Sequence, residues 1–339
     1  MKLDMKKIYI CCPANSYTGG PTLAHQLCSI LNKNGFDAYM FYYGKKKHLK
    51  EDKIIHENYK VFNNPYVLEI TDSSNNIIIS TETYTKILKK YNNAIKIIWW
   101  MSVDNYFATY GGLFSKLLRK LNYTSNIQSK IRKIRKIKNI DYKSSEIRHF
   151  VQSEYARLFL QEEGIDVNRI FYLSDFLEDQ ILDEVYNIRD KKDIVAYNPK
   201  KGFKFTQKII LHNQDIEWVP LINMSKKDII KTLKESKLYI DFGNHPGKDR
   251  FPREAVVLGN CLITGRKGSA NNNLDIPIDS LYKFNEDNSS IEQISDKMKY
   301  VLTNYEVCLR DFDDYRHSIL KEKQKFEKDA KSIFDDLVK

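Results

Sequence analysis

The sequence of 339 residues has few of the features that mark membrane-spanning or disulfide-bonded proteins. No apolar stretch approaches the length that crosses a bilayer, and the run from Ile8 to Cys12 is too short for a signal-peptide core. The five cysteines are odd in number and contain no Cys-x-x-Cys pair. They favour free, mostly buried thiols in a reducing compartment, so we expect a cytoplasmic protein, at most peripheral to the inner face of the plasma membrane.

Two motifs that would indicate a bound group are also missing. The glycines do not follow the Gly-x-Gly-x-x-Gly spacing of dinucleotide-binding folds, so we expect no nicotinamide or flavin cofactor. The loops after the predicted strands hold no Asp-x-Asp triplet of the kind that binds a metal–diphosphate complex. We therefore expect a site that works without a metal ion.

What is present is a globular composition with an excess of positive charge. Hydrophobic residues make up 42% of the chain and charged residues 29%, which excludes a disordered chain. The length suits two domains, which we place at residues 1–178 and 179–304, followed by a helical tail at 305–339. The formal net charge of +11 predicts an anionic partner, whether nucleic acid, anionic lipid or a phosphorylated substrate.

The first half alternates strand and helix patterns, which is typical of an α/β fold with a parallel sheet. Apolar runs predict strands over residues 8–12, 37–43, 76–80, 94–101, 146–153 and 170–173. A helix is predicted over 22–33, and the turn Gly19-Gly20-Pro21 precedes it. The two glycines would let the backbone approach a ligand closely, and the proline suits the first turn of a helix.

Polar side chains follow two of these strands. Glu82 comes after the strand at 76–80, and Asp104, Asn105 and Tyr106 come after the strand at 94–101. Ligands bind at the carboxyl ends of strands in open α/β sheets, so Glu82 and Asp104 are candidate active-site carboxylates. A helix cap or a solvated turn is the alternative for both.

The second half repeats the pattern, with strands predicted over 193–197, 216–222, 237–242 and 261–264. Three cationic loops follow strands: Lys200-Lys201-Gly202, Lys248 to Arg253, and Arg266-Lys267-Gly268. Their convergence would form a diphosphate site, because Lys and Arg neutralise phosphate oxygens and glycine amides approach them closely. Glu254 would accept hydrogen bonds from a ribose diol; its alternative role is a favourable charge in the first turn of a helix.

Residues 116–138 form a basic amphipathic segment in which no acidic residue occurs. Such a segment is typical of contact with an anionic membrane surface or a long anionic acceptor. An ordinary solvated helix is the alternative. No helix-turn-helix or aromatic-rich basic pattern accompanies the segment, so we do not predict nucleic-acid binding.

Several of these motifs together resemble the GT-B glycosyltransferases, in particular their large retaining group that uses nucleotide sugars. Gly19-Gly20-Pro21 resembles the glycine-rich N-terminal loop of that superfamily, and Lys201-Gly202 resembles its diphosphate-contacting Lys-Gly. The segment from Phe251 to Thr264 is similar to Leu-Pro-x-Glu-Ala-x-Ala-x-Gly-x-Pro-Val-Ile, which puts Glu254 at the donor-ribose glutamate. The segments Trp-Trp-Met-Ser-Val-Asp-Asn-Tyr and His-Pro-Gly-Lys-Asp-Arg-x-Pro-Arg-Glu are similar to a bacterial subgroup that acts in surface-polysaccharide assembly.

The chain departs from the group's pattern in three places. Pro246 stands where the group has a second glutamate, and Asn198-Pro199 stands where an arginine precedes Lys-Gly. The acceptor-side histidine has no match, because Ser102-Val103-Asp104 lies there. These departures leave retaining and inverting transfer both open, and the donor sugar, base, acceptor, linkage and oligomeric state are not specified.

The resemblance implies two Rossmann-like domains that face a cleft, with the C-terminal helix crossing back to the N-terminal domain. It also implies transfer of a sugar from a nucleoside diphosphate sugar, as co-substrate, to a glycan or lipid-linked acceptor in capsule or lipopolysaccharide synthesis. A non-catalytic polyanion- or membrane-binding protein on the same fold is the alternative, and a nucleotide-sugar phosphorylase or epimerase, which would turn over the donor without an acceptor, is a third option.

Roles for the site residues follow from that interpretation. The leaving diphosphate would be stabilised by cations, and the nucleotide base would lie near Val219 to Leu221. His245 and Asp249 would meet the donor sugar, and Asp104 would act on the acceptor side. Asp104 and His245 are the catalytic candidates, and Glu82, Asn105 and Tyr106 are the further acceptor-side candidates. The donor-binding set is Gly19, Gly20, Lys200, Lys201, Gly202, Val219, Leu221, Lys248, Asp249, Arg250, Arg253 and Glu254.

Overall fold

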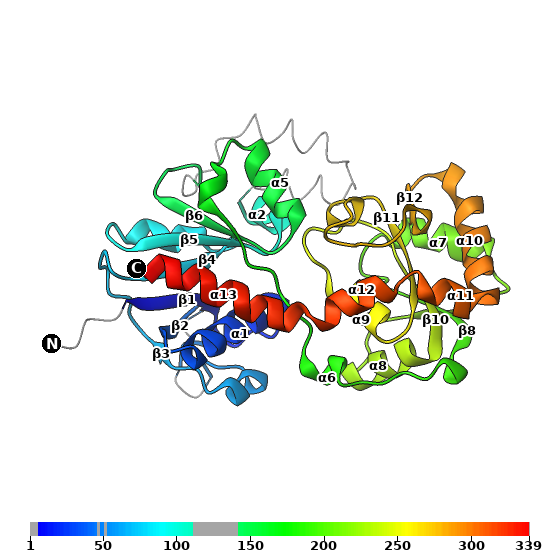
Figure 1. The fold of residues 1–339 in the computed structure, drawn as a ribbon, viewed down its shortest axis with the longest axis horizontal. Coiled ribbons are helices and arrows are strands. Elements are labelled where there is room, and N and C mark those ends of the chain that lie inside the picture. The colour runs from blue at the N-terminus through cyan, green and yellow to red at the C-terminus, as the bar shows by residue number, and fades with distance from the viewer. Residues whose placement is uncertain (1–5, 46–47, 51–52, 111–141, 339) are drawn as a thin grey trace. The chain divides into compact units, whose positions relative to one another are not determined.

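The computed structural model describes residues 6–45, 48–50, 53–110 and 142–338, and the basic segment 116–138 lies outside these ranges. The chain divides into two compact units. Unit 1 comprises Met1–Asp175 with Gln324–Lys339, and unit 2 comprises Phe176–Lys323. Each unit contains one parallel sheet with helices between its strands (Figure 1), which confirms the predicted α/β class. None of the helices in the described ranges combines the length and the hydropathy of a membrane span.

Unit 1 is built on a seven-stranded sheet in the order β3-β2-β1-β4-β5-β6-β7. Its strands are β1 (Lys7–Pro13), β2 (Asp37–Tyr43), β3 (Tyr66–Val67), β4 (Ile77–Thr81), β5 (Ile95–Trp100), β6 (Ile147–Val151) and β7 (Ile170–Tyr172). Its helices are α1 (Gly19–Lys33), α2 (Val103–Tyr110) and α5 (Glu154–Glu162), with 3-10 segments η2 (Glu57–Phe62), η3 (Thr85–Lys90) and η4 (Val167–Arg169). The sequence pattern predicted every one of these strands except β3, which has only two residues.

Two adjacent tryptophans show how helices cover both faces of this sheet. Side chains alternate along a strand, so Trp99 and Trp100 of β5 point to opposite faces. Trp99 stacks on Phe326 of the C-terminal helix α13 (Glu322–Val338), with ring centroids 6.4 Å apart. Trp100 packs against Phe159 of α5 at 5.4 Å. Because the sheet is buried on both faces, its strands appear in the sequence as nearly continuous apolar runs.

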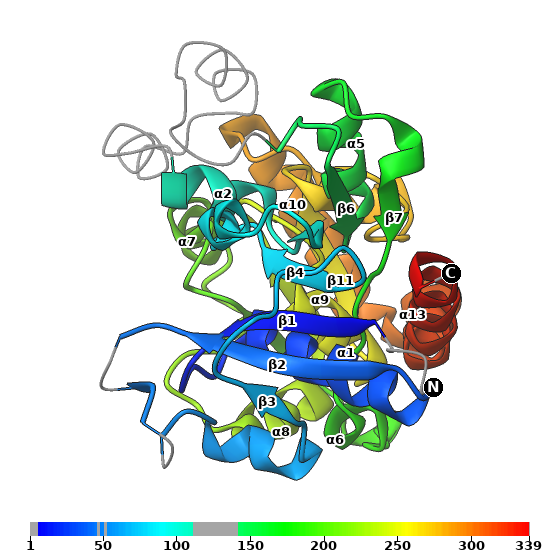
Figure 2. The ribbon, with the colours of Figure 1, turned by 90° about the vertical axis from the view of Figure 1, so that its left-hand side faces the viewer.

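Helix α13 packs on the unit that contains the N-terminus, as the resemblance implied. It begins at Glu322 in unit 2 and continues into unit 1. Near its end, the Lys6 ammonium donates to the carbonyl of Leu337 at 3.2 Å, and Figure 2 shows the end of α13 near the start of β1. The ring of Phe334 packs against Phe150 of β6 at 5.8 Å.

Unit 2 is built on a five-stranded sheet in the order β12-β11-β10-β8-β9. Its strands are β8 (Lys192–Tyr197), β9 (Glu217–Pro220), β10 (Ser236–Asp241), β11 (Cys261–Gly265) and β12 (Lys283–Phe284). Its helices are α6 (Asp179–Leu182), α7 (Phe203–His212), α8 (Lys226–Glu235), α9 (Arg250–Val257), α10 (Ile291–Thr303), α11 (Tyr305–Arg310) and α12 (Asp313–Leu320). The helical tail at 305–339 therefore consists of α11 and α12, which belong to unit 2, and α13, most of which belongs to unit 1.

In both sheets the strand order reverses at one place. In unit 1, β1 continues to β2 on one side and β4 continues to β5 on the other, so the reversal lies between β1 and β4. In unit 2 the same argument puts it between β8 and β10. Ligands of open α/β sheets bind outside the carboxyl ends of the strands at such a reversal. The loops after β1, β4, β8 and β10 are therefore the places where a functional site is expected.

Candidate functional site

At the reversal in unit 1, the structure brings together three of the predicted loops. Gly19 and Gly20 are the first two residues of α1 and follow β1. A Cβ atom on Gly20 would lie 3.4 Å from the Met101 Sδ, in the loop after β5. The backbone amide of Met101 in turn donates to the Glu82 Oε2 at 3.1 Å, after β4. Glu82 and the glycine turn therefore lie at one edge of the sheet, linked through Met101.

Glu82 is a buried carboxyl group at this edge. Glu82 is 3% exposed, and no positively charged group in the described ranges lowers the pKa of its carboxyl. Burial raises the pKa of the Glu82 carboxyl to about 8, against the opposing effect of hydrogen bonds from the amides of Met101 and of Glu82 itself. A carboxyl held neutral at a ligand-binding edge donates a hydrogen bond to a bound hydroxyl, and once ionised it accepts a proton from one.

The acceptor-side candidates on α2 differ in exposure. Asp104 is half-buried in the first turn of the helix, and Asn105 is exposed. Tyr106 is 1% exposed, and its ring packs against Trp100 with centroids 5.1 Å apart. Residues three apart share a helix face, so Tyr106 is buried together with Val103. Tyr106 therefore belongs to the core of unit 1, whereas Asp104 and Asn105 lie at its surface.

At the reversal in unit 2, two loops meet through glycine backbones. Gly202 precedes α7 with φ 62°, and a Cβ atom there would lie 2.2 Å from the carbonyl oxygen of Phe242. A Cβ atom on Gly243, where φ is 101°, would lie 2.6 Å from the Gly202 nitrogen. Only glycine fits both positions, because the left-handed conformation and the lack of space each exclude a side chain. Gly202 was predicted to let backbone approach a ligand; its neighbour in the structure is the loop after β10.

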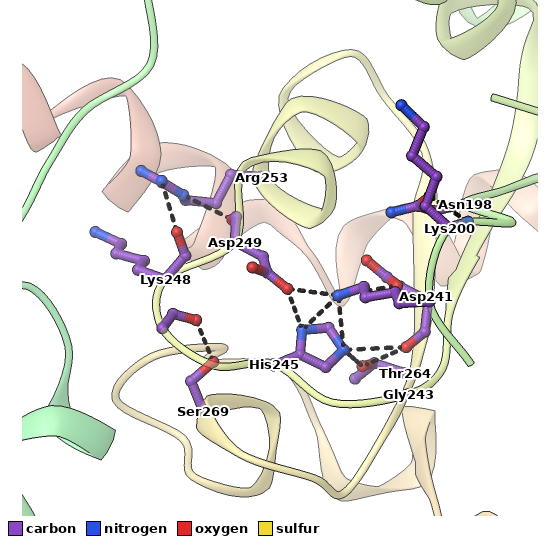
Figure 3. A network of polar contacts seen from close by, with 12 residues as sticks. Asn198, Lys200, Asp241, Gly243, His245, Lys248, Asp249, Arg253, Thr264 and Ser269 are labelled. Carbon is purple, nitrogen blue, oxygen red and sulfur yellow. Dashed lines mark hydrogen bonds and ion pairs between the residues drawn. The ribbon is translucent and has the colours of Figure 1, made fainter. Parts of the chain in front are cut away.

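A compact ionic cluster surrounds the ammonium of Lys201 beside these glycines. The Lys201 Nζ lies 2.5 Å from the Asp249 Oδ2 and 3.1 Å from the Asp241 Oδ1. It also lies 3.2 Å from Nδ1 of the His245 ring. Figure 3 shows this ring beside Asp249, whose Oδ2 is 3.0 Å from Nδ1. On the other side of the ring, Nε2 lies 3.2 Å from the Asp241 carbonyl oxygen and 3.4 Å from the Thr264 hydroxyl.

Charge pairing dominates the chemistry of this cluster. Burial opposes the charges of Lys201 and Asp249, but their mutual attraction outweighs it and raises the pKa of the ammonium while lowering the pKa of the Asp249 carboxyl. For Asp241 burial prevails over the attraction of Lys201 and raises the carboxyl pKa. The sequence analysis predicted that His245 meets the donor sugar. In the structure the His245 side chain is fully buried. The cluster holds two carboxylates for one lysine, so it is not an electropositive patch.

The other predicted diphosphate ligands also have carboxylate partners. Arg253 is fully buried, and its NH1 lies 2.7 Å from the Glu322 Oε2. Lys248 Nζ lies 2.7 Å from the other oxygen of the same carboxylate. Arg250 NH2 donates to Glu178 at 3.1 Å, and its Nε lies 3.8 Å from Glu254. These cations therefore hold α9, α13 and the start of unit 2 together.

The remaining donor-side candidates lie around this cluster. Lys200 is exposed, next to Lys201 in the sequence, and no carboxylate pairs with its ammonium in the part of the chain that the structure describes. Val219 of β9 is half-buried, and Leu221 just after β9 is buried. Glu254 of α9 is largely buried, and burial raises the pKa of its carboxyl despite the nearby charge of Arg250.

Sequence reasoning missed several residues that shape the site. Asp241 ends β10, inside the strand predicted over 237–242, and a carboxylate at the end of an apolar strand was the available signal. Glu286 accepts from the Gly243 amide at 2.8 Å and pairs with Lys267 at 2.7 Å. Glu322 gave no local signal, because it is 69 positions from Arg253 and lies in a helix rich in alternating charge.

No family model matches the chain, and no curated protein matches it by sequence. Solved structures match it in fold. Sucrose-phosphate synthase from Thermosynechococcus elongatus is similar with a TM-score of 0.61 at 10% identity, over 98% of this chain and 99% of that one. HepE from Anabaena, in complex with UDP, gives 0.55 at 9% identity, over 98% and 99%. The lipopolysaccharide outer core galactosyltransferase WaaB gives 0.54 at 11%, over 96% and 100%. The expected GT-B fold is thereby confirmed over nearly the whole chain.

Proposed function

We propose that the protein is a glycosyltransferase that moves a sugar from a nucleoside diphosphate sugar to a glycan or lipid-linked acceptor in bacterial surface-polysaccharide synthesis. The close approach of Gly202 and Gly243 carries this proposal, because it puts backbone amides at the reversal of the second sheet, beside the helix of Glu254. Fold likeness supports the donor class, since HepE was solved with UDP and with UDP-glucose. The name of WaaB supports the polysaccharide role. On this proposal unit 2 binds the donor and unit 1 the acceptor.

The donor diphosphate would lie against the starts of α7 and α9. Gly202 and Asp249 are the N-cap residues of α7 and α9, and neither accepts a hydrogen bond from the helix amides with its side chain. Uncapped amides and the helix dipole favour an anion at both places. The exposed Lys200 adds a positive charge beside the start of α7. Glu254 would hold the ribose, with the nucleotide base near Val219 and Leu221.

The paired cations would act as the framework of the donor site. Lys201, Lys248, Arg250 and Arg253 each have a carboxylate partner, so their main effect is to fix the loop from Gly243 to Asp249. A fixed loop keeps its amides aimed at the place where charge develops on the leaving diphosphate. This electrostatic stabilisation needs no metal ion. Among the four, Lys201 and Arg250 keep partly exposed side chains and would contribute directly to the field at the diphosphate.

On the acceptor side, Glu82 and Asp104 are the two carboxyl groups at the edge of the first sheet. The acceptor hydroxyl loses its proton as its oxygen bonds to the sugar carbon, and the electron pair of the broken bond goes to the diphosphate. In an inverting transfer Asp104 would accept that proton; in a retaining transfer Asp104 would orient the acceptor, and an oxygen of the leaving diphosphate would accept the proton. The anomeric configuration of the product distinguishes these, and full activity of Asp104→Asn would remove Asp104 from a base role.

A donor screen tests the proposal. The full chain is incubated with a panel of nucleotide sugars and a crude glycolipid acceptor, and product masses are measured. We expect one donor to give a hexose-sized mass increase, and Glu254→Gln to raise its KM about 10- to 100-fold through lost ribose hydrogen bonds. Glu235, a half-buried residue at the end of α8 that pairs with Lys192, provides the control variant Glu235→Gln, with unchanged KM. Binding of anionic vesicles without affinity for any nucleotide sugar would contradict the proposal.

A further inference from the structure

The side chains around the Lys201 ammonium are those that bind divalent metal ions. Asp241, His245 and Asp249 each offer one ligand atom, and the three atoms lie within 4.8 Å of one another. Asp241 and His245 are 1% and 0% exposed, so two of the three are withdrawn from water. One imidazole with two carboxylates is a ligand set that Zn²⁺ and Mn²⁺ accept. We call these three side chains the Asp–His–Asp cage.

The spacing within the cage also suits a metal ion. The His245 Nδ1 and the Asp249 Oδ2 are 3.0 Å apart. With metal–ligand bonds of about 2.1 Å, two ligands stand about 3.4 Å apart in a tetrahedral zinc site and about 3.0 Å apart at the right angles of an octahedral site. The Lys201 Nζ stands 2.5, 3.1 and 3.2 Å from Asp249, Asp241 and His245, so a metal ion with bonds of about 2.1 Å would draw the three side chains inward.

Asp241 gives a second and independent indication that the cage requires a cation. Its Oδ2 accepts from the hydroxyl of Tyr239 at 3.1 Å. Its Oδ1 is fully buried and accepts no hydrogen bond of ordinary geometry, and the Lys201 ammonium faces it as an ion-pair partner at 3.1 Å. A buried carboxylate oxygen without a cation or a donor carries a large desolvation cost.

We infer that Asp241, His245 and Asp249 form a divalent-cation site whose built-in cation in this chain is the Lys201 ammonium. The lysine comes from the loop after β8, and the cage comes from the end of β10 and the loop after it. The tethered ammonium therefore links the two loops at the reversal of the second sheet, as a metal ion would. This inference does not rest on the proposed transferase activity.

Lys201→Met tests the inference, because it keeps an unbranched side chain and removes the charge. Lys200→Met is the matched control, since Lys200 is the neighbouring exposed lysine outside the cage. Each full-length variant is titrated with Zn²⁺ by calorimetry and with Co²⁺ by visible absorption. We expect Lys201→Met to bind one equivalent at least 100-fold more tightly than the unaltered chain or Lys200→Met. Adding His245→Gln to Lys201→Met should weaken binding at least 10-fold.

Circular dichroism keeps the test decisive if Lys201→Met does not fold. In that case Zn²⁺ should restore the fold, because the metal replaces the missing cation. A folded Lys201→Met that does not bind Zn²⁺ would overturn the inference, as would an unfolded one that Zn²⁺ does not rescue. Equal Zn²⁺ affinity of the unaltered chain and Lys201→Met would also overturn it, because the ammonium would then not be the occupant.

Discussion

Arg253 of α9 and Glu322 at the start of α13 form a buried ion pair, with the Arg253 NH1 2.7 Å from the Glu322 Oε2. The same carboxylate also accepts Lys248 at 2.7 Å, so one glutamate neutralises two cations. The remaining guanidinium nitrogens of Arg253 lie 3.2 Å and 3.4 Å from the carbonyl oxygens of Asp249 and Lys248. The first turn of the C-terminal helix is thereby attached to the loop that carries His245 and Asp249 of the Asp–His–Asp cage.

Removing either partner of this pair should destabilise the protein. Arg253→Met leaves a largely buried carboxylate with one cation instead of two, and Glu322→Gln leaves the buried guanidinium without its carboxylate. We expect each to lower the free energy of unfolding by about 3 kcal/mol. The loss of unfolding free energy in the double variant should be smaller, by at least about 1 kcal/mol, than the sum of the losses in the two single variants. Thermal unfolding measures this, and the exposed pair of Lys323 with Asp179 gives the control Lys323→Met, at about 0.5 kcal/mol or less.

The contact between Gly202 and Gly243 should not tolerate a side chain. Gly202→Ala would bring a Cβ atom to 2.2 Å from a backbone oxygen, so the two loops would have to separate. The matched control is Gly35→Ala, which has a similarly positive φ of 84° but no atom within 4 Å of the added Cβ. Gly35→Ala should lower the free energy of unfolding by about 1–2 kcal/mol, through backbone strain alone. We expect a clearly larger loss for Gly202→Ala in urea unfolding; equal losses would show that the clash is relieved without cost.

Glu82 should make stability depend on pH in a definite direction. The pKa of the Glu82 carboxyl is about 8 in the folded chain, against an ordinary value of 4.5 that applies to the unfolded chain. Between pH 4.5 and 8 the folded chain therefore keeps a proton on Glu82 that the unfolded chain has lost. The stability that Glu82 provides is complete below pH 4.5 and is lost as pH rises through 8, at up to about 1.4 kcal/mol per pH unit. The side chain of Glu82→Gln cannot titrate. The free energy of unfolding of this variant should therefore rise relative to that of the unaltered chain between pH 6 and 9.

Urea unfolding at several pH values from 6 to 9 measures this gain. Glu146 is exposed and pairs with Lys96, so Glu146→Gln serves as the control and should follow the unaltered chain across the range. Parallel curves for Glu82→Gln and the unaltered chain would mean that the Glu82 carboxyl is ionised throughout.

Lys191 should contribute far more to stability than its neighbour Lys192. The buried Lys191 ammonium donates to the carbonyl oxygens of Leu233, Ser236 and Leu258, at 2.9, 2.9 and 2.8 Å. The ammonium thus provides hydrogen-bond donors for carbonyls at the ends of α8 and α9. We expect Lys191→Met to lower the free energy of unfolding by about 3 kcal/mol or more. Lys192 is exposed and pairs with Glu235, so Lys192→Met should cost less than about 1 kcal/mol. Comparable unfolding midpoints of the two variants would contradict this role.

Local sequence patterns were sufficient to predict the α/β class and ten of the twelve strands in the described ranges, and they suggested the loops in which a site would lie. These features depend on local patterns, because strands buried on both faces are continuously apolar and turns require glycine or proline. The two strands that were missed, β3 and β12, have two residues each and are too short to show such a pattern. The resemblance added the C-terminal helix that returns to unit 1.

The pairing of the charged residues became visible only in the folded structure. The sequence grouped Lys201, Lys248, Arg250 and Arg253 as ligands of a diphosphate. Their carboxylate partners come from other elements, such as Glu178 before α6, 72 positions from Arg250, and Glu322 in α13. Pairing at that separation is set by how the helices pack on the sheets, and no local pattern encodes it. For the same reason burial, which decides that Tyr106 and His245 are interior and that Glu82 is neutral, became visible only in the folded chain.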